Sequence, residues 1–378
     1  MVNLRWLNPS EDKINFESFV KFSNICFKLV FFTYRPLDEA SSFVKKIVYA
    51  ARIILSIITL FGNGLIVTSL TLFSLLDASD ILEASANVPF VFTELLIAVR
   101  IIVILFSKQK VWMICNELKS LELNRESKFK KFVKENLKEY LRFITTYVIV
   151  MVGVMAPIGF PMIQFLINGT ISFQINHWTP YDSHTPGNFL PTSLFIFVFA
   201  INCMFYMMGT DSLLYSLMTV VAMEFNILKI DFTQLKSLTN DERNKKINEL
   251  IATHNKLLEL ADDLQSIYGF FLLYNFLTSS LMMCFLAFQI STGGDIGFYA
   301  STIAMVGGQV LLLCFYGQKI LDSSSDVASG VYECGWEEFK DKSLKKKLLL
   351  VMMRAQNSKK LTAMGYVDIS LRTFTTVR

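Results

Sequence analysis

Two ionisable residues, Glu94 and Arg100, lie inside the stretch 88–106, which is otherwise almost entirely apolar. A charged side chain inside a bilayer is costly, so such residues are first considered as functional. A spacing of six residues does not place two side chains on one helix face, which requires three, four or seven. Arg100 lies near the end of the stretch, where its long side chain can reach the membrane surface, so we interpret it as structural. Glu94 is interpreted either as a residue that lines a pocket or as a residue that packs within the helix bundle.

Two further stretches carry aromatic and sulfur-containing side chains at helical spacing. They are Tyr147, Met151, Val154, Met155 and Ile158 within 143–167, and Phe195, Phe199, Cys203 and Tyr206 within 189–221. Such a face suits a pocket for an apolar small molecule, because methionine adapts its shape and aromatic rings supply contact area. Helix–helix packing is the alternative, since a chain with 34 Phe has many such faces. His177 and Trp178, in the segment 168–188 between these two stretches, are interpreted either as a lid over that pocket or as an ordinary structured loop.

The elements that carry these residues are predicted membrane-spanning helices. The sequence of 378 residues is 53% hydrophobic and only 18% charged, whereas a soluble domain is about 25% charged. Six long apolar stretches follow one another, at 47–76, 88–106, 143–167, 189–221, 267–290 and 296–317. Three of them, 143–167, 267–290 and 296–317, contain no Asp, Glu, Lys or Arg, which is typical of transmembrane helices. We therefore predict an all-α polytopic membrane protein.

No motif in the sequence indicates catalysis. Glycine-rich nucleotide loops, a nucleophile elbow and the cysteine–histidine spacing of zinc sites are absent from it. The net charge of +4 is too small to indicate nucleic-acid binding. We predict that the protein is not an enzyme, uses no cofactor or metal, and binds no nucleic acid.

Basic residues alternate between the connecting segments. Segments 1–46, 107–139, 226–266 and 318–347 carry seven, nine, six and six Lys or Arg, whereas 77–87, 168–188 and 291–295 carry none. Under the positive-inside rule the basic segments, including the N-terminus, are cytoplasmic. A seventh crossing would then leave the C-terminus outside, which is opposite to a G-protein-coupled receptor. Asn168 begins an N-x-[ST] sequon in an outer segment and is a candidate glycosylation site.

Helical periodicity continues into the cytoplasmic segments. Apolar stripes such as Leu250, Leu257 and Leu264 must bury against a partner, so we predict a helical cytoplasmic bundle, with membrane-surface helices as the alternative. The predicted parts are a cytoplasmic segment 1–46, a six-helix transmembrane domain 47–317 with cytoplasmic extensions 107–142 and 222–266, an anchor 318–368, and the start of a seventh helix at 369–378.

Short motifs mark the last third of the sequence. They are Tyr316-Gly317, the polar stretch Ser323 to Ser329, Tyr332-x-Cys334-x-Trp336, Met353-Arg354-Ala355-Gln356 and Ser370-Leu371-x-x-Phe374. Together they resemble the insect odorant receptor family, and the stretch 254–268 is also similar to it. The resemblance implies an odorant-gated, nonselective cation channel of four subunits in the plasma membrane of olfactory sensory neurons. It also implies that this chain is the tuning receptor, assembled with a shared co-receptor subunit and surrounded by membrane lipids.

The resemblance further implies a pocket for volatile apolar molecules in the outer half of the membrane, formed by the second, third, fourth and sixth spans. The candidate ligand residues are Phe90, Glu94, Tyr147, Met151, Val154, Met155, Ile158, Phe199, Cys203, Tyr206, Tyr299 and Ile303. The candidate pore residues, on the seventh helix, are Thr373, Thr376 and Val377.

The last ten residues, Ile369 to Arg378, reach only about halfway across a bilayer core of about 30 Å. The family's seventh helix continues further, so we expect the sequence to be truncated within that helix. A gustatory receptor of the same superfamily, a G-protein-coupled receptor and a secondary transporter are the alternative functions. The transporter is disfavoured because the halves show no repeat and no ladder of intramembrane carboxylates.

Overall fold

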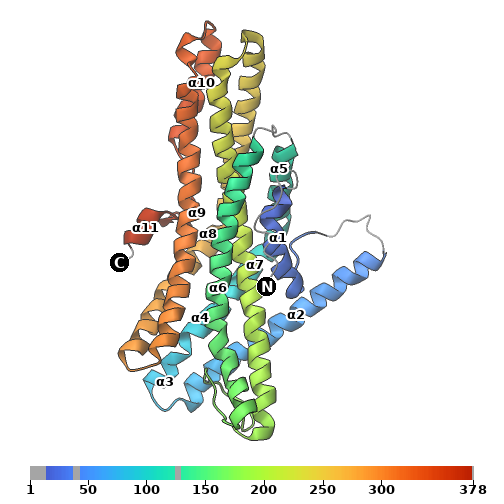
Figure 1. Cartoon of the computed structure of the whole chain (residues 1–378), viewed down its shortest axis with the longest axis vertical. Coiled ribbons are helices and arrows are strands. Elements are labelled where there is room, and N and C mark those ends of the chain that lie inside the picture. The colour runs from blue at the N-terminus through green and yellow to red at the C-terminus, as the bar shows by residue number, and fades with distance from the viewer. Residues whose placement is uncertain (1–13, 37–42, 124–128, 377–378) are drawn as a thin grey trace.

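The computed structural model describes residues 14–36, 43–123 and 129–376, and these form a long helical bundle (Figure 1). Its helices are α1 (Phe16–Leu29), α2 (Phe43–Leu72), η3 (a π-helical end, Phe73–Asp77), α3 (Ile81–Ala86), α4 (Val88–Phe106), α5 (Lys108–Leu123), α6 (Lys130–Asn168), α7 (Pro186–Thr233), η5 (a 3₁₀ turn, Gln234–Ser237), α8 (Asn240–Ser291), α9 (Ile296–Glu333), η6 (a 3₁₀ turn, Trp336–Glu338), α10 (Lys342–Gln356) and α11 (Leu371–Thr376). Two short strands, β1 (Thr362–Ala363) and β2 (Val367–Asp368), pair antiparallel.

Six helices of the described chain are long and apolar enough to cross a membrane. They are Phe43–Asp77, Ile81–Phe106, Lys130–Asn168, Pro186–Ser237, Glu242–Ser291 and Ile296–Glu333. They contain the six stretches predicted from the sequence, and α4 has the predicted limits, so the all-α membrane fold is confirmed. The helices extend beyond the predicted spans, because α6, α7, α8 and α9 continue as single helices into the polar segments.

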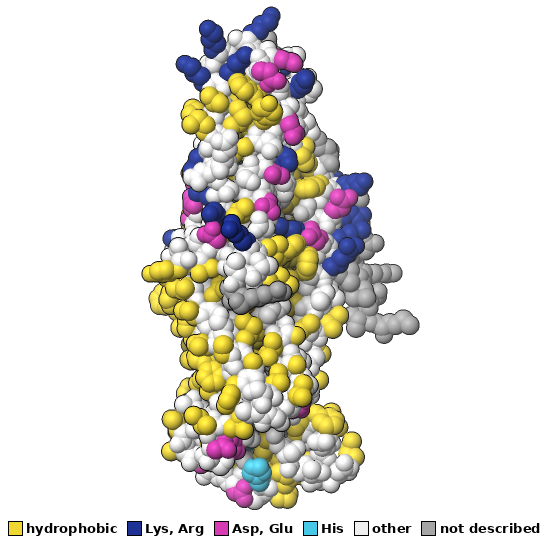
Figure 2. All heavy atoms as spheres, turned by 90° about the vertical axis from the view of Figure 1, so that its left-hand side faces the viewer, with side chains coloured by type: hydrophobic (Ala, Val, Ile, Leu, Met, Phe, Trp, Pro, Cys, Tyr) yellow, Lys and Arg dark blue, Asp and Glu magenta, His cyan; other side chains and the backbone are white. Residues whose placement is uncertain are grey.

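Charge separates the two ends of the molecule (Figure 2). Lys and Arg gather around the end that holds α10 and around the middle of the molecule, whereas hydrophobic side chains dominate the other half. We call the α10 end the basic end. The opposite end holds α3 and the segment 169–185, and we call it the loop end (Figure 1). The bundle thus has an apolar belt next to the loop end and a polar helical extension at the basic end.

Helix α7 is the centre of the bundle. It packs against α1, α6, α8 and α9, and nearly every side chain from Met204 to Phe225 is buried. Close approach of helices requires small residues: a Cβ on Gly330 of α9 would lie 2.6 Å from the Lys229 carbonyl oxygen of α7. The N-terminal helix α1 also packs on α7, where Cys26 and Phe27 lie against Gly209.

Local capping fixes where several helices begin and end. Helices α1 and α8 start with capping boxes at Asn15 and Thr239, in which side chains satisfy the free backbone N–H groups of the first turn. The Asp295 carboxylate accepts a hydrogen bond from the Phe298 N–H at the start of α9. Helix α6 ends at Gly169, whose φ of 69° is a left-handed conformation that favours glycine.

The sequence motifs did not predict the small hairpin between α10 and α11. Its turn has positive φ at Met364 (52°) and Gly365 (83°), as hairpin turns often do. The Gln265 side chain of α8 pairs with the edge of β1 by accepting from the Thr362 N–H (2.6 Å) and donating to its carbonyl oxygen (2.9 Å). The hairpin leads into Ile369, which lies directly against Gly317 of α9.

The contact between Gly317 and Ile369 gives a stability prediction. A Cβ on Gly317 would lie 2.3 Å from the Ile369 carbonyl oxygen, so Gly317→Ala must push the backbone of residue 369 away. We expect a loss of about 1–3 kcal/mol, measured by thermal unfolding of the purified protein. Gly308→Ala, on the same helix with no atom near the new Cβ, is the control and should be neutral or stabilising by up to about 1 kcal/mol. Equal effects of the two substitutions would contradict the close packing.

Candidate functional site

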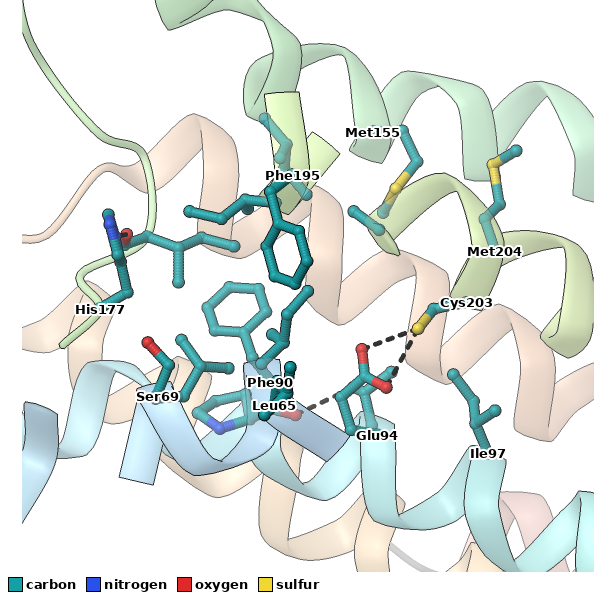
Figure 3. Close-up of a pocket in the computed structure, with 18 of the residues that line it drawn as sticks. Leu65, Ser69, Phe90, Glu94, Ile97, Met155, His177, Phe195, Cys203 and Met204 are labelled. Carbon is teal, nitrogen blue, oxygen red and sulfur yellow. Dashed lines mark hydrogen bonds between the residues drawn. The ribbon is translucent and has the colours of Figure 1, made fainter. Parts of the chain in front are cut away.

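An apolar cavity of about 470 Å³ lies near the loop end. Its walls come from α2, α4, α6, α7 and α9, with Met282 of α8 and with Ile175 and residues 177–181 of the loop between α6 and α7. Figure 3 shows Phe90, Phe195 and Met155 around the cavity, with Ser69 and His177 at one end and Glu94 with Cys203 towards the other. The volume and the largely apolar wall are those of a site for a small organic molecule.

Seven of the twelve candidate ligand residues line this cavity. They are Phe90, Glu94, Met151, Val154, Met155, Ile158 and Cys203. The other five, Tyr147, Phe199, Tyr206, Tyr299 and Ile303, are not among the residues of its wall.

Helical register explains most of these differences. On α9 the cavity wall is formed by Phe298, Thr302 and Met305, and Tyr299 and Ile303 each follow a wall residue by one position, which turns the side chain by about 100°. Tyr206 instead faces α2, where its hydroxyl lies 3.0 Å from Ser56 Oγ. Phe199 also faces α2, and its ring fills the space beside Gly62.

The wall also includes residues outside the four spans that the resemblance implied, among them the loop that was one of the two interpretations of His177 and Trp178. The first span contributes residues from Leu65 to Leu72, although the resemblance implied only the second, third, fourth and sixth spans. The loop contributes Trp178, whose N–H donates to the Ser69 carbonyl oxygen at 3.2 Å, while the Ser69 hydroxyl donates to the Trp178 carbonyl oxygen. The loop therefore covers the cavity and is also held by defined hydrogen bonds. Hydrogen bonds between a loop and a distant helix leave no periodic pattern in the sequence.

Glu94 is the one acidic side chain in the described wall, and its partner is a thiol. The Sγ–H of Cys203, on α7, lies 2.9 Å and 3.0 Å from the two carboxylate oxygens of Glu94, on α4 (Figure 3). The described residues include no Lys, Arg or His in an ion pair with Glu94. The imidazole of His177 does not supply a charge either, because burial lowers its pKa below the usual value and keeps it neutral at pH 7.

A buried polar network forms the layer directly beneath the cavity, on the side of the basic end. The guanidinium of Arg100 lies 2.7 Å from Asp211 Oδ1, and both side chains are almost fully buried. Asp211 Oδ2 accepts hydrogen bonds from the Tyr147 hydroxyl at 2.7 Å and from Gln309 Nε2 at 2.8 Å. Arg100 also lies over the ring of Phe271, 4.9 Å from its centre.

Each member of this network lies one helical turn from a residue of the cavity wall. The pairs are Ile97 with Arg100 on α4, Met151 with Tyr147 on α6, Met207 with Asp211 on α7, and Met305 with Gln309 on α9. The expectation that Arg100 extends to the membrane surface is therefore wrong, because a carboxylate on another helix compensates its charge inside the bundle. Tyr147 belongs to this network rather than to the cavity.

The remaining candidates lie away from the cavity. The Thr373 hydroxyl donates to the Asp368 carbonyl oxygen and the Thr376 hydroxyl to Arg372, so both hydroxyls are satisfied within their own segment. Val377 lies outside the described residues. Asn168 is the exposed last residue of α6, at the loop end.

The chain is similar to known proteins in both sequence and fold. The sequence matches the 7tm odorant receptor family over residues 80–378. It is 24% identical to putative odorant receptor 92a of Drosophila melanogaster over 319 residues, which cover 79% of this chain and 77% of that protein. It is 38% identical to odorant receptor 85f of the same organism over 144 residues, which cover 36% of each chain.

Solved structures show a similar fold. The insect olfactory receptor OR5 from Machilis hrabei matches with a TM-score of 0.84 and 14% identity, covering 95% of this chain and 94% of that chain. The structure of OR5 in complex with eugenol matches with a TM-score of 0.83 and 15% identity. The likeness therefore extends over nearly the whole chain.

The buried network predicts a specific stability pattern. Asp211→Asn leaves the Arg100 charge buried without a counter-charge, and we expect a loss of about 3–5 kcal/mol. Arg100→Met combined with Asp211→Asn removes both charges and keeps an amide oxygen for Tyr147, so it should recover most of that loss. Thermal unfolding and the yield of monodisperse protein measure both effects.

The ion pair between Lys319 and Glu139 is the control, because it has the same 2.7 Å separation but partly exposed side chains. Glu139→Gln should cost less than about 1 kcal/mol, since water screens an exposed pair. If Asp211→Asn is as mild as Glu139→Gln, the network does not stabilise the bundle.

Proposed function

The chain belongs to the 7tm odorant receptor family, and we propose on this basis that it is the ligand-binding subunit of an odorant-gated, nonselective cation channel. The channel would be a heterotetramer with a shared co-receptor subunit in the plasma membrane of olfactory sensory neurons. The observation that supports a ligand-binding role best is the apolar cavity of about 470 Å³ between the spans. Family membership makes the chain a multi-pass membrane receptor rather than an enzyme.

The ligand would be a small volatile molecule that is largely apolar. Burial of apolar surface drives the binding of such molecules, and a wall of methionine and aromatic side chains adapts to several shapes. Met155 and Met204 of the wall, together with Phe90 and Phe195, supply such contacts (Figure 3). The similar receptor OR5 was solved with eugenol, which supports a small organic ligand for this chain too.

Gating would follow from a difference in ligand affinity between the closed and open states. A ligand presses on α4, α6, α7 and α9, and the same four helices meet again at Asp211 one turn below. Helix α9 then continues to Gly317, where it touches Ile369 just before α11. We infer that a shift of α9 is passed by this contact to the segment 369–376, which would line the pore.

The basic end would be the cytoplasmic anchor that holds the subunits together. Helix α10 presents Leu350 and Met353 to the outside, with exposed fractions of 65% and 60%. Exposed apolar side chains outside the apolar belt mark a surface for another protein chain. The N-terminus would be cytoplasmic, the C-terminus would be extracellular, and Asn168 would face the outside as a glycosylation site.

The central experiment is co-expression with the co-receptor subunit, followed by recording of currents during exposure to a panel of volatile compounds. We expect an inward cation current for some apolar members of the panel. Ala200→Phe places a ring into the cavity and should raise the half-maximal concentration of these ligands at least about tenfold, or abolish the response. Ala98→Phe, at an exposed position on α4, is the control and should behave as wild type.

Surface expression of each variant is measured with an epitope tag, so that loss of folding is separated from loss of binding. If wild type reaches the surface with the co-receptor and no compound of a broad panel evokes a current, the channel proposal fails. If Ala200→Phe and Ala98→Phe have equal effects, the cavity is not the ligand site.

The orientation is tested by thiol labelling. Lys346→Cys at the basic end and Gln174→Cys at the loop end are both at exposed positions, and Cys284, which is also exposed, is replaced by alanine in both variants. An impermeant maleimide should label residue 174 on intact cells and residue 346 only after permeabilisation. The reverse result would exclude the proposed orientation.

A further inference from the structure

The polar atoms of the cavity wall are almost all acceptors. The hydroxyl hydrogens of Ser69, Thr93 and Thr302 already donate to backbone carbonyl oxygens of Trp178, Pro89 and Phe298. The Thr192 hydroxyl donates to the Asn188 carbonyl oxygen at 2.7 Å. A hydroxyl whose hydrogen is committed presents only lone pairs to a ligand.

The loop side of the wall follows the same pattern. The hydroxyls of Tyr181 and Thr192 lie 3.0 Å apart, and because Thr192 donates elsewhere, Tyr181 is the donor of this pair. His177 Nδ1 lies 3.2 Å from the Ile175 carbonyl oxygen, so the neutral ring carries its hydrogen there and has a lone pair on Nε2. The indole N–H of Trp178 is the exception on this side.

Glu94 is the strongest of these acceptors. A carboxylate offers about four lone-pair sites, whereas Cys203 provides one weak thiol donor for both oxygens. The neighbouring intramembrane cation, Arg100, is already neutralised by Asp211. An ionised Glu94 would have no counter-charge among the described residues, and an unpaired carboxylate is costly where hydrocarbon largely replaces water, so a cationic ligand would stabilise its charged form.

We propose that the preferred ligands are small apolar amines, bound as alkylammonium ions with the nitrogen on the Glu94 carboxylate and the hydrocarbon part among Phe90, Phe195 and Met155. This inference rests on the proposed function and names the ligand class of the same cavity. Figure 3 shows the geometry: the carboxylate and the Cys203 sulfur lie at one side of the cavity, and the aromatic rings border the space beyond. An ammonium group supplies both the positive charge and three N–H donors, which matches a wall of acceptors.

Charge also ranks the competing ligand classes. An alcohol supplies one donor and no charge, an aldehyde supplies only an acceptor, and an alkane supplies neither. Charge-assisted hydrogen bonds are the strong class, and we expect an advantage of at least about tenfold in half-maximal concentration for the amine over the aldehyde. The alcohol should fall between them.

The test uses hexylamine, hexan-1-ol, hexanal and heptane, which have the same number of non-hydrogen atoms. Currents are recorded from the full chain with the co-receptor, and the ratio of half-maximal concentrations for hexanal and hexylamine is the readout. We expect a ratio of at least about ten for wild type and a ratio near one for Glu94→Gln, which keeps the size of the side chain and removes its charge. Glu94→Asp keeps the charge and should retain a preference for the amine.

Cys203 gives a second, matched pair of variants. Cys203→Ala removes the competing thiol donor and should increase the amine preference, whereas Cys203→Ser keeps a donor and should leave the ratio close to that of wild type. Binding of hexylamine to purified protein, followed by the fluorescence of Trp178 in the wall with Trp178→Phe as the control for the signal, gives a readout that does not depend on conduction.

The outcomes separate the two proposals. Currents with hexanal or heptane that exceed those with hexylamine would retain the odorant-gated channel and overturn the amine inference. An unchanged amine preference in Glu94→Gln would also overturn it. Binding of hexylamine that depends on Glu94, without any current, would support the ligand class and contradict the channel.

Discussion

The ion pair between Arg100 and Asp211 is the interaction on which the arrangement of the spans depends. A charge buried inside a bundle is stable only when a counter-charge and hydrogen bonds satisfy it. Asp211 supplies the counter-charge for Arg100 of α4, and through hydrogen bonds from Tyr147 and Gln309 it also binds α6 and α9. One carboxylate on the central helix therefore fixes the relative positions of the four spans that also form much of the cavity wall.

Two acidic side chains within the spans have opposite roles because of what surrounds them. Asp211 has a cation and two neutral hydrogen-bond donors within 2.8 Å, so the protein itself uses the acceptor sites of this carboxylate. Glu94 lies on the cavity wall, where the Cys203 thiol is its one hydrogen-bond donor among the described residues, so most of its acceptor sites remain available to the proposed ligand. Glu94, the proposed ligand-binding residue, and Arg100, the partner of Asp211, are about 1.7 helical turns apart along α4.

The six spans could be predicted from the sequence, because a long apolar run identifies each membrane-spanning helix without reference to the other helices. It also predicted seven residues of the cavity wall, since helical spacing places Met151, Val154, Met155 and Ile158 on one face. It could not predict the partner of Arg100, because Asp211 lies on another span and no spacing rule connects them. Tyr299 and Ile303 were each placed one residue out of register, which only the packing of α9 against its neighbours decides. The Gln265 contact that pairs with the hairpin edge is likewise a meeting of distant segments.

Helix α9 runs without interruption from the cavity wall at Phe298 to Glu333 at the basic end. A rigid rod of this kind acts as a lever: a tilt of about 5° around Thr302 would move Gly317 by about 2 Å and Val331 by about 4 Å, from a rise of 1.5 Å per residue. A molecule small enough to fit between the spans could thereby produce displacements larger than its own bond lengths of about 1.5 Å, far from where it binds. Because α9 has no break, a small tilt at the cavity becomes a larger displacement at the far end of the same helix.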